Sequence, residues 1–287
     1  MTRNECNRIL LERLSFVLQM DSLCTGDSLQ ELMQLGIGQE EAMAAVLLSR
    51  MGLDPEENLG KEIYRGYLPK MLKQGSPEEV EKDPFVQAVG NLEFRQGNKR
   101  LAMDTLEPYQ LFIRNDFEID GQGRVLPQLG FYDRPIRFPV LLENERSWMS
   151  AEPNEIATLR PLAEKAHGKV VMLGLGLGYY AFHALLSKKV RSVTVVERDQ
   201  EIISLFEKVL LPHFPRKEAV SIVKADAFSF VRNELPKLGA DTVLVDLWKH
   251  AGDGMELYSR MKQMEFSGPE WQYWIEKTIK YYLEEKE

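Results

Sequence analysis

The chain has 287 residues, with 36 Lys and Arg against 44 Asp and Glu, and a formal net charge of −8. This acidic balance argues against a general nucleic-acid-binding protein, which usually carries a basic face. No apolar run approaches the ~20 residues that cross a bilayer, so no membrane association is expected. Two cysteines, Cys6 and Cys24, and four scattered histidines indicate neither a disulfide framework nor a metal site. A cytoplasmic location is therefore the default expectation.

Residues 1–90 are predicted to form an N-terminal helical region. Apolar residues at helical spacing predict helices over 4–20, 28–35, 39–51 and 56–73, the last with a kink at Pro69. A further helix is expected to start at Ser76-Pro77-Glu78-Glu79, which has the form of a capping box. No titratable cluster stands out, so we interpret the region as a helical bundle with an apolar core.

Residues 91–145 are predicted to form a small antiparallel β region. Short strands are expected over 92–95, 100–103, 109–114, 117–120, 124–126 and 136–142, the first two joined by a hairpin turn. The aromatic and charged stretch Phe131-Tyr132-Asp133-Arg134-Pro135 is either a packed loop or a substrate contact. In the second interpretation Tyr132 is the candidate substrate-binding residue.

The stretch KVVMLGLGLGYY, residues 169–180, is the strongest signal of the third segment, 146–287. A short apolar run predicts a buried strand, three alternate glycines allow a tight turn, and the helix that follows supplies unpaired N–H groups. The spacing is not the G-x-G-x-x-G of dinucleotide sites, and the Lys-Ser/Thr end of a phosphate-binding loop is missing. G-x-G-x-G after an apolar strand resembles instead the S-adenosylmethionine loop of the class I methyltransferases.

Three later strands each lead to an acidic residue. The strand over 192–196 ends on Glu197, which is placed to accept hydrogen bonds from two ribose hydroxyls. The strand over 219–223 leads to Asp226, and the strand over 242–245 ends at Asp246. A helix over about 152–167, capped by Ser150 or Asn154 and ended by Gly168, precedes the first strand.

Residues 148–250 therefore resemble the class I methyltransferases, including the related spermidine-synthase-like group. The resemblance implies a Rossmann-like α/β sheet, preceded here by the helical bundle and the small antiparallel sheet. It also implies that an acid in the position of Asp226 binds the adenine amino group and that its neighbour packs on the ring. The expected S-adenosylmethionine-binding residues are Gly174, Leu175, Gly176, Gly178, Tyr179, Glu197, Arg198, Asp226, Ala227 and Asp246.

The C-terminal end departs from the family pattern, in which three more strands follow the fourth. Residues 254–264 and 269–287 are predicted to be helical, the second helix with Trp271 and Trp274 on its apolar side, and no fifth β-rich run is found. The sheet is therefore expected to be shortened. One edge would need cover from the C-terminal helix, from the N-terminal part or from another subunit, and a homodimer would provide the last of these.

The residues after the fourth strand suggest the chemistry. Asp246 is expected beside the sulfonium, where it would bind a cationic amine or take its proton; the alternative is a plain turn cap. Trp248 would offer an aromatic face to the substrate, and His250 would relay a proton as a second catalytic candidate. No Asn/Asp-Pro-Pro-Tyr/Phe motif is present, which counts against methylation of nucleic-acid bases or protein glutamine.

The sequence thus predicts an S-adenosylmethionine-dependent methyltransferase with a small, amine-bearing acceptor and no metal. The first alternative is an aminopropyltransferase, although the Asp followed by Ser-Ser/Thr-Asp-Pro of spermidine synthases is absent after Asp246. The second alternative is a non-catalytic S-adenosylmethionine-binding protein.

Overall fold

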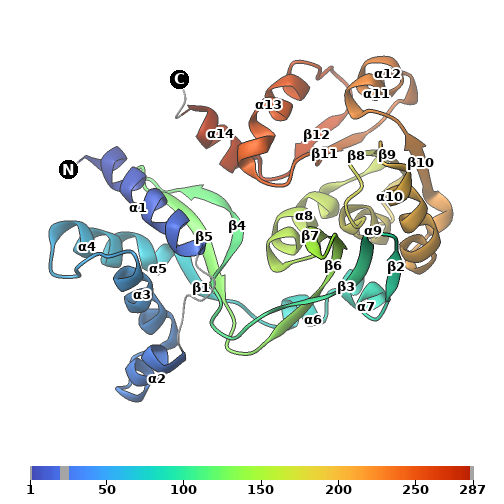
Figure 1. Ribbon diagram of the computed structural model, residues 1–287. Coiled ribbons are helices and arrows are strands. Elements are labelled where there is room, and N and C mark those ends of the chain that lie inside the picture. Colours follow the sequence, from blue (N-terminus) through green and yellow to red (C-terminus); the bar gives the residue numbers. More distant parts are fainter. Residues whose placement is uncertain (1, 20–25, 285–287) are drawn as a thin grey trace. The chain divides into compact units, whose positions relative to one another are not determined.

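The computed structural model describes residues 2–19 and 26–284 of the chain (Figure 1). Cys24 lies outside these ranges. The chain divides into two compact units, Met1–Glu81 with Thr105–Arg137, and Lys82–Asp104 with Phe138–Glu287. This grouping differs from the three successive segments expected over 1–90, 91–145 and 146–287. The β region is shared between the units, since part of it belongs with the N-terminal helices.

The first unit combines short helices with a three-stranded sheet of order β1-β5-β4. Its elements are α1 (Arg3–Leu18), α2 (Gly26–Gln34), α3 (Gln39–Arg50), α4 (Asn58–Glu62), the π-helical η1 (Ile63–Tyr67), α5 (Leu68–Met71), β1 (Leu72–Gln74), α6 (Glu78–Glu81), β4 (Phe112–Ile119) and β5 (Val125–Phe131). β5 pairs parallel with β1 and antiparallel with β4. A purely helical bundle was expected before residue 90, so β1 is a correction.

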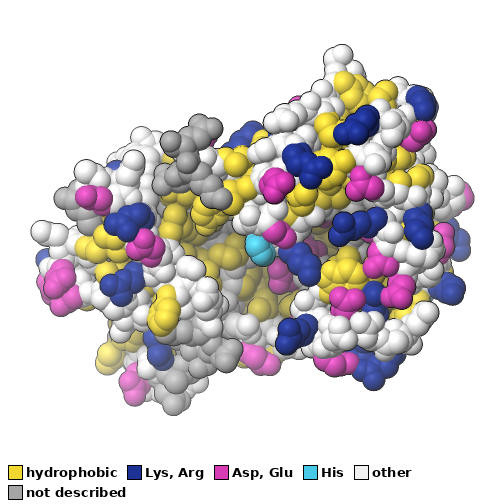
Figure 2. All heavy atoms as spheres, turned by 45° about the horizontal axis from the view of Figure 1, so that its top comes forward, with side chains coloured by type: hydrophobic (Ala, Val, Ile, Leu, Met, Phe, Trp, Pro, Cys, Tyr) yellow, Lys and Arg dark blue, Asp and Glu magenta, His cyan; other side chains and the backbone are white. Residues whose placement is uncertain are grey.

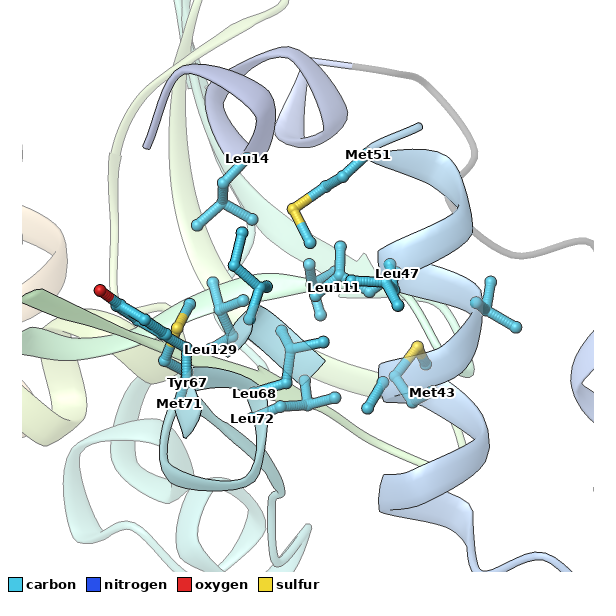
Figure 3. Close-up of a cluster of buried hydrophobic side chains, with 14 of the residues drawn as sticks. Leu14, Met43, Leu47, Met51, Tyr67, Leu68, Met71, Leu72, Leu111 and Leu129 are labelled. Carbon is cyan, nitrogen blue, oxygen red and sulfur yellow. The ribbon is translucent and has the colours of Figure 1, made fainter. Parts of the chain in front are cut away.

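The core of this unit is one cluster of buried apolar side chains (Figure 3). Leu14 comes from α1, Met43 and Leu47 from α3, and Leu129 from β5. The helix expected over 56–73 is divided because Pro69 has no N–H to donate, and the widened turn η1 precedes it.

The second unit contains a four-stranded sheet of order β2-β3-β6-β7. The strands are β2 (Phe94–Gln96), β3 (Lys99–Leu106), β6 (Ile136–Glu143) and β7 (Arg146–Ser150). β7 was not expected from the sequence. It forms a hairpin with β6 through Asn144 and Glu145, which both have positive φ, as two-residue hairpin turns require.

The larger sheet of the second unit has five strands, and every pairing between them is parallel. They are β8 (Gly168–Leu173), β9 (Val190–Glu197), β10 (Val220–Lys224), β11 (Thr242–Val245) and β12 (Glu270–Tyr273), in the order β10-β9-β8-β11-β12. The chain runs outward from β8 through β9 to β10 and then returns to β11 on the other side of β8. This reversal makes β8 and β11 the switch point of a Rossmann-like α/β fold.

Helices cover both faces of this sheet (Figure 1). They are α7 (Pro84–Val89), α8 (Pro153–Lys165), α9 (Tyr179–Leu186), α10 (Gln200–Leu205), α11 (Ala227–Asn233), α12 (Leu235–Leu238), α13 (Ala251–Lys262) and α14 (Glu276–Glu284). Right-handed crossovers place α9 and α10 on one face and α11 and α13 on the other. The contact between Arg260 of α13 and the Phe228 ring of α11, at 4.2 Å, agrees with this arrangement.

The expectation that no strand follows the fourth is wrong. Within the described part of the expected helix 269–287, residues 270–284 form β12 and then α14, and β12 pairs with β11 from Thr242 to Val245. Trp271 and Tyr273 stack on each other at 6.5 Å from alternate positions of the strand. The outer edge of β11 is thus occupied by a strand of the same chain.

Two further expectations are corrected at α8. Its N-cap is Glu152, without a side-chain capping bond, so neither Ser150 nor Asn154 caps it. Gly168 does not end this helix; it opens β8 with a φ of +63°, where an added Cβ would collide with the Asp241 carboxylate. Among residues 2–19 and 26–284, no helix combines the length and apolar character needed to traverse a bilayer.

Candidate ligand-binding site

A cavity of about 530 Å³ lies where the parallel strands of the second unit end. The strand register aligns Leu173 with Val196 and with Val245, so the residues that follow these strands meet at one edge of the sheet. Ligands of open α/β sheets bind at this edge beside the switch point. All residues that line the cavity belong to the second unit.

The three glycines of the loop after β8 are required for different reasons. Gly174 has a φ of +93°, and a Cβ there would lie 2.0 Å from the carbonyl oxygen of Asp246. Gly178 has a φ of +83°, and a Cβ there would meet the rings of Phe206 and Phe214. Gly176 also has positive φ, but no protein atom lies within 4 Å of its would-be Cβ. Gly174 and Gly176 both line the cavity, and of the three glycines only Gly176 has open space where a side chain would be.

Glu197 ends β9 and holds the glycine loop from the side. Its carboxylate accepts backbone N–H bonds from Leu175 at 3.3 Å, Arg198 at 2.7 Å and Asp199 at 2.9 Å. Two carboxylate oxygens offer about four lone-pair sites, so acceptor capacity remains for a ligand. One ligand hydroxyl suits the remaining site on Oε2, which accepts only the Leu175 bond.

Asp226 and Phe228 form the wall beyond β10. Asp226 caps α11, because its Oδ1 accepts from the backbone N–H of Ser229 at 2.9 Å, and its other oxygen is left for a ligand donor. The ring of Phe228 lines the cavity and carries the Arg260 guanidinium 4.2 Å from its centroid. This wall combines an acceptor with a flat apolar surface, as a heteroaromatic ring with an amino group requires.

A group of three acidic residues also lines the cavity. Asp246 follows β11, and Glu152 and Glu155 belong to the first turn of α8 and its cap. Burial raises the pKa of Asp246 to about 7. Burial also raises the pKa of Glu155 well above its ordinary value, and the charges of Glu152 and Asp246 raise it further. A cation bound beside these carboxyls would favour their ionised forms and so oppose the upward shifts in their pKa.

The lining as a whole is acidic. Six carboxylic residues line the cavity against two basic ones, Arg198 and Lys249; the acids are Glu152, Glu155, Glu197, Asp199, Asp226 and Asp246. Elsewhere, on the molecular face drawn in Figure 2, positive and negative side chains of the described residues are interspersed. Within the described ranges, no group of three or more His, Cys, Asp or Glu side chains has the geometry of a metal site.

The cavity brings together most of the residues named from the sequence. Those that line it are Gly174, Leu175, Gly176, Tyr179, Glu197, Arg198, Asp226, Ala227, Asp246 and Trp248. Trp248 is only 6% exposed, and its ring lies against Gly254 at the start of α13. The Tyr179 hydroxyl donates to Asp83 at 2.8 Å and is not available to a ligand.

Three residues named from the sequence do not line the cavity. Gly178 packs on Phe206 and Phe214 behind the loop. His250, named as a proton relay, caps α13 by accepting from the backbone N–H of Asp253, and its side chain is 73% exposed. Tyr132, named as a substrate contact, is 3% exposed in the first unit, where its ring stacks on Phe112 at 5.1 Å. The packed-loop interpretation of its surroundings is the one the geometry favours.

Sequence reasoning missed several residues of the site. Glu152, Glu155 and Leu159 lie on one face of α8, at a spacing that the sequence displays but that is common to many surface helices. Trp274 was assigned to a helix, yet it follows β12 and its indole N–H donates to Thr158 at 2.8 Å. Trp274 reaches the cavity wall because it directly follows β12, a strand that the sequence did not predict.

Comparisons with known proteins add little. No protein-family model and no curated protein matches the chain. Among solved structures, the spermidine synthase from Thermotoga maritima is similar with a TM-score of 0.34 and 14% sequence identity. The similarity covers 64% of this chain and 56% of that structure's chain, so little more than half of that protein's length is spanned. The assignment of function therefore depends on the geometry of the cavity.

Proposed function

We propose that the protein binds S-adenosylmethionine in this cavity and transfers its methyl group to a small, amine-bearing acceptor. The observation that carries the proposal is the position of three acids around one glycine loop. Glu197, Asp226 and Asp246 follow three different strands and line the same cavity, with the open backbone of Gly176 between them.

Each acid has a role that its surroundings support. Glu197 would hold one ribose hydroxyl on the acceptor site that its carboxylate keeps after three backbone bonds, and the second hydroxyl would replace the long Leu175 bond. Asp226 would accept from the adenine amino group, and Phe228 would pack on the ring. The acidic group around Asp246 and Glu155 would face the cationic end of the ligand.

The chemistry asks little of the protein beyond alignment. S-adenosylmethionine supplies a methyl group already activated on a sulfonium, so the site must mainly orient the acceptor and exclude water. An amine acceptor arrives as an ammonium ion, and it must lose a proton before it is nucleophilic. Asp246, with a pKa of about 7, would hold the ammonium and accept that proton near neutral pH.

Aminopropyl transfer is a second candidate because the cavity is so acidic. Six carboxylic residues against two cations disfavour the carboxylate of S-adenosylmethionine and favour its decarboxylated, dicationic form. The two reactions leave different products. Methyl transfer leaves S-adenosylhomocysteine, whereas aminopropyl transfer leaves methylthioadenosine.

Calorimetric titration of the purified protein tests the proposal. We expect S-adenosylmethionine and S-adenosylhomocysteine to bind and NAD to give no heat, because the loop lacks the dinucleotide spacing. Incubation with labelled cofactor and an amine mixture, analysed by mass spectrometry, then distinguishes the two products. Tight NAD binding with no response to either sulfur ligand would refute the proposal, and binding without any product would leave a sensor as the function.

A further inference from the structure

Asp83 is a buried carboxylate that the proposed chemistry does not use. It is 1% exposed and caps α7, where it accepts backbone N–H bonds from Phe85 at 2.9 Å and Val86 at 3.1 Å. A cap needs only these two bonds. The same carboxylate nevertheless binds three side chains from elsewhere.

These side chains come from the two helices that flank the cavity. The Tyr179 hydroxyl donates to Asp83 Oδ2 at 2.8 Å, and His183 Nε2 lies 3.2 Å from the same oxygen. Arg160 of α8 forms an ion pair with Asp83, and its Nε also donates to the Tyr179 hydroxyl at 3.3 Å. Asp83 therefore joins α8 to the first two turns of α9.

Both joined helices contribute to the cavity wall. Tyr179 is the first residue of α9, follows directly on the glycine loop and lines the cavity. Glu155 and Leu159, which both precede Arg160 on α8, line the same cavity. A shift of α9 relative to α8 would move the loop and the acidic wall apart.

We propose that Asp83 is a positioning residue for the ligand site, fixing Tyr179, and through it the glycine loop, against α8. The ligand assignment in this inference rests on the proposed function. Asp83 and Arg160 occupy the Tyr179 hydroxyl, so this side chain anchors the start of α9 and offers no hydrogen bond to the ligand. An anchored aromatic ring and loop reduce the ordering that ligand binding must otherwise bring about.

The charge of Asp83 suits this role. Burial alone would raise its pKa, but hydrogen bonds from His183, Tyr179 and the backbone of Val86 lower it below the ordinary value. The carboxylate is therefore ionised at neutral pH and forms charge-assisted bonds, which are shorter and stronger than neutral ones. Asparagine keeps the size of the side chain but replaces one acceptor with a donor that faces other donors.

The test compares Asp83→Asn with Asp241→Asn. Asp241 is a matched control, because it also binds a backbone N–H, that of Lys169 at 2.7 Å, and an arginine, Arg191 at 2.8 Å, but at the opposite end of the strands. S-adenosylhomocysteine is the probe. We expect Asp83→Asn to weaken its binding by ~10-fold or more, since small misplacements of a site are costly, and Asp241→Asn to change it by less than about twofold.

Amide hydrogen exchange of the free protein supplies a readout that needs no ligand. Asp83→Asn should speed exchange over residues 174–186 selectively, and Asp241→Asn should not. Tyr179→Phe, which removes one hydroxyl, should speed exchange over the same residues to a smaller extent. It replaces Asp83→Asn in the test if that variant fails to fold. Equal exchange rates and equal affinities in the two aspartate variants would overturn the inference. If Asp83→Asn does not fold, an unchanged exchange rate in Tyr179→Phe would overturn it. Selective exchange without ligand binding by the unmodified protein would instead refute the proposed function and leave the positioning role standing.

Discussion

The titration of Asp246 is expected to make the stability of the folded protein depend on pH. Its pKa is about 7 in the folded protein against an ordinary value of 3.8, so ionisation opposes folding. The penalty is absent below pH 3.8, grows as the pH rises toward 7 and is constant above it. Asp246→Asn should therefore raise the melting temperature at pH 8 and leave it nearly unchanged at pH 4. Equal melting curves for the two proteins at pH 8 would show that the carboxyl is not destabilised by burial.

The same titration should appear in ligand binding. A sulfonium prefers the ionised carboxylate, so affinity for S-adenosylmethionine should rise by ~10-fold between pH 6 and pH 8, as the ionised fraction of a group with pKa about 7 does. S-adenosylhomocysteine lacks the sulfonium charge and is the matched control, with a smaller change. Calorimetry at several pH values measures both. Identical pH dependence for the two ligands would contradict the placement of Asp246 beside the sulfonium.

Glu197 offers a simpler test at the ribose. Glu197→Ala should cost about 1.5–3 kcal/mol of S-adenosylmethionine binding, the range for hydrogen bonds to a charged group. The variant should also lose some stability, because Glu197 holds Leu175, Arg198 and Asp199 through their backbone N–H groups. Calorimetry and a thermal melt separate the two effects. Unchanged affinity in the folded variant would show that the ribose does not bind the Glu197 carboxylate.

At the scale of elements, the glycine loop separates a binding role from a packing role. Gly176→Ala places a methyl group in the open space of the cavity, so it should weaken ligand binding. Its cost in folding stability should be only the ~1–3 kcal/mol of a strained φ of +54°. Gly178→Ala has a similar φ but also drives a Cβ into Phe206 and Phe214 at 2.6 and 2.9 Å. It should therefore lose clearly more stability, as measured by denaturant unfolding. A larger stability loss in Gly176→Ala would contradict these two assignments.

Elements with one strong signal were predictable from the sequence, and those with two competing patterns were not. The strand over 242–245 matches β11 from Thr242 to Val245, because its apolar run is short and clearly bounded. Residues 270–275 fit both periods: Trp271, Trp274 and Ile275 have helical spacing, while Trp271 and Tyr273 alternate as in a strand. Pairing with β11 decides between them, and a pairing partner is not visible in a local pattern.

The candidate site divides in the same way. Residues just after strands, such as Glu197 and Asp226, could be named because strand ends of a parallel sheet meet at one edge. Glu155 and Asp83 could not, because their roles depend on how α8 and α7 pack. The place of His250 could not be predicted for a related reason, since the sequence does not distinguish a histidine that caps a helix, as His250 does, from one that faces a site.

At the scale of the whole molecule, the second unit includes packed residues that precede the smaller β region in the chain. Phe85 of α7 packs edge-to-face on Tyr179 and Phe182, each at 5.4 Å, and Asp83 joins α8 to α9. A fragment that starts at Ser147 lacks both residues and also β6, the partner of β7. We expect this fragment to be poorly soluble or to unfold without cooperativity, compared with one that starts at Lys82. A cooperative thermal melt of the shorter fragment, equal to that of the longer one, would contradict this division of the chain.

The central claim is that the cavity at the ends of β8, β9 and β11 is a nucleoside site. A crystal structure of the full chain with S-adenosylhomocysteine tests it most directly. We expect the ribose hydroxyls on the Glu197 carboxylate, the adenine beside Asp226 and Phe228, and the sulfur facing Asp246. A ligand bound elsewhere, or one bound here with its ribose away from Glu197, would contradict it.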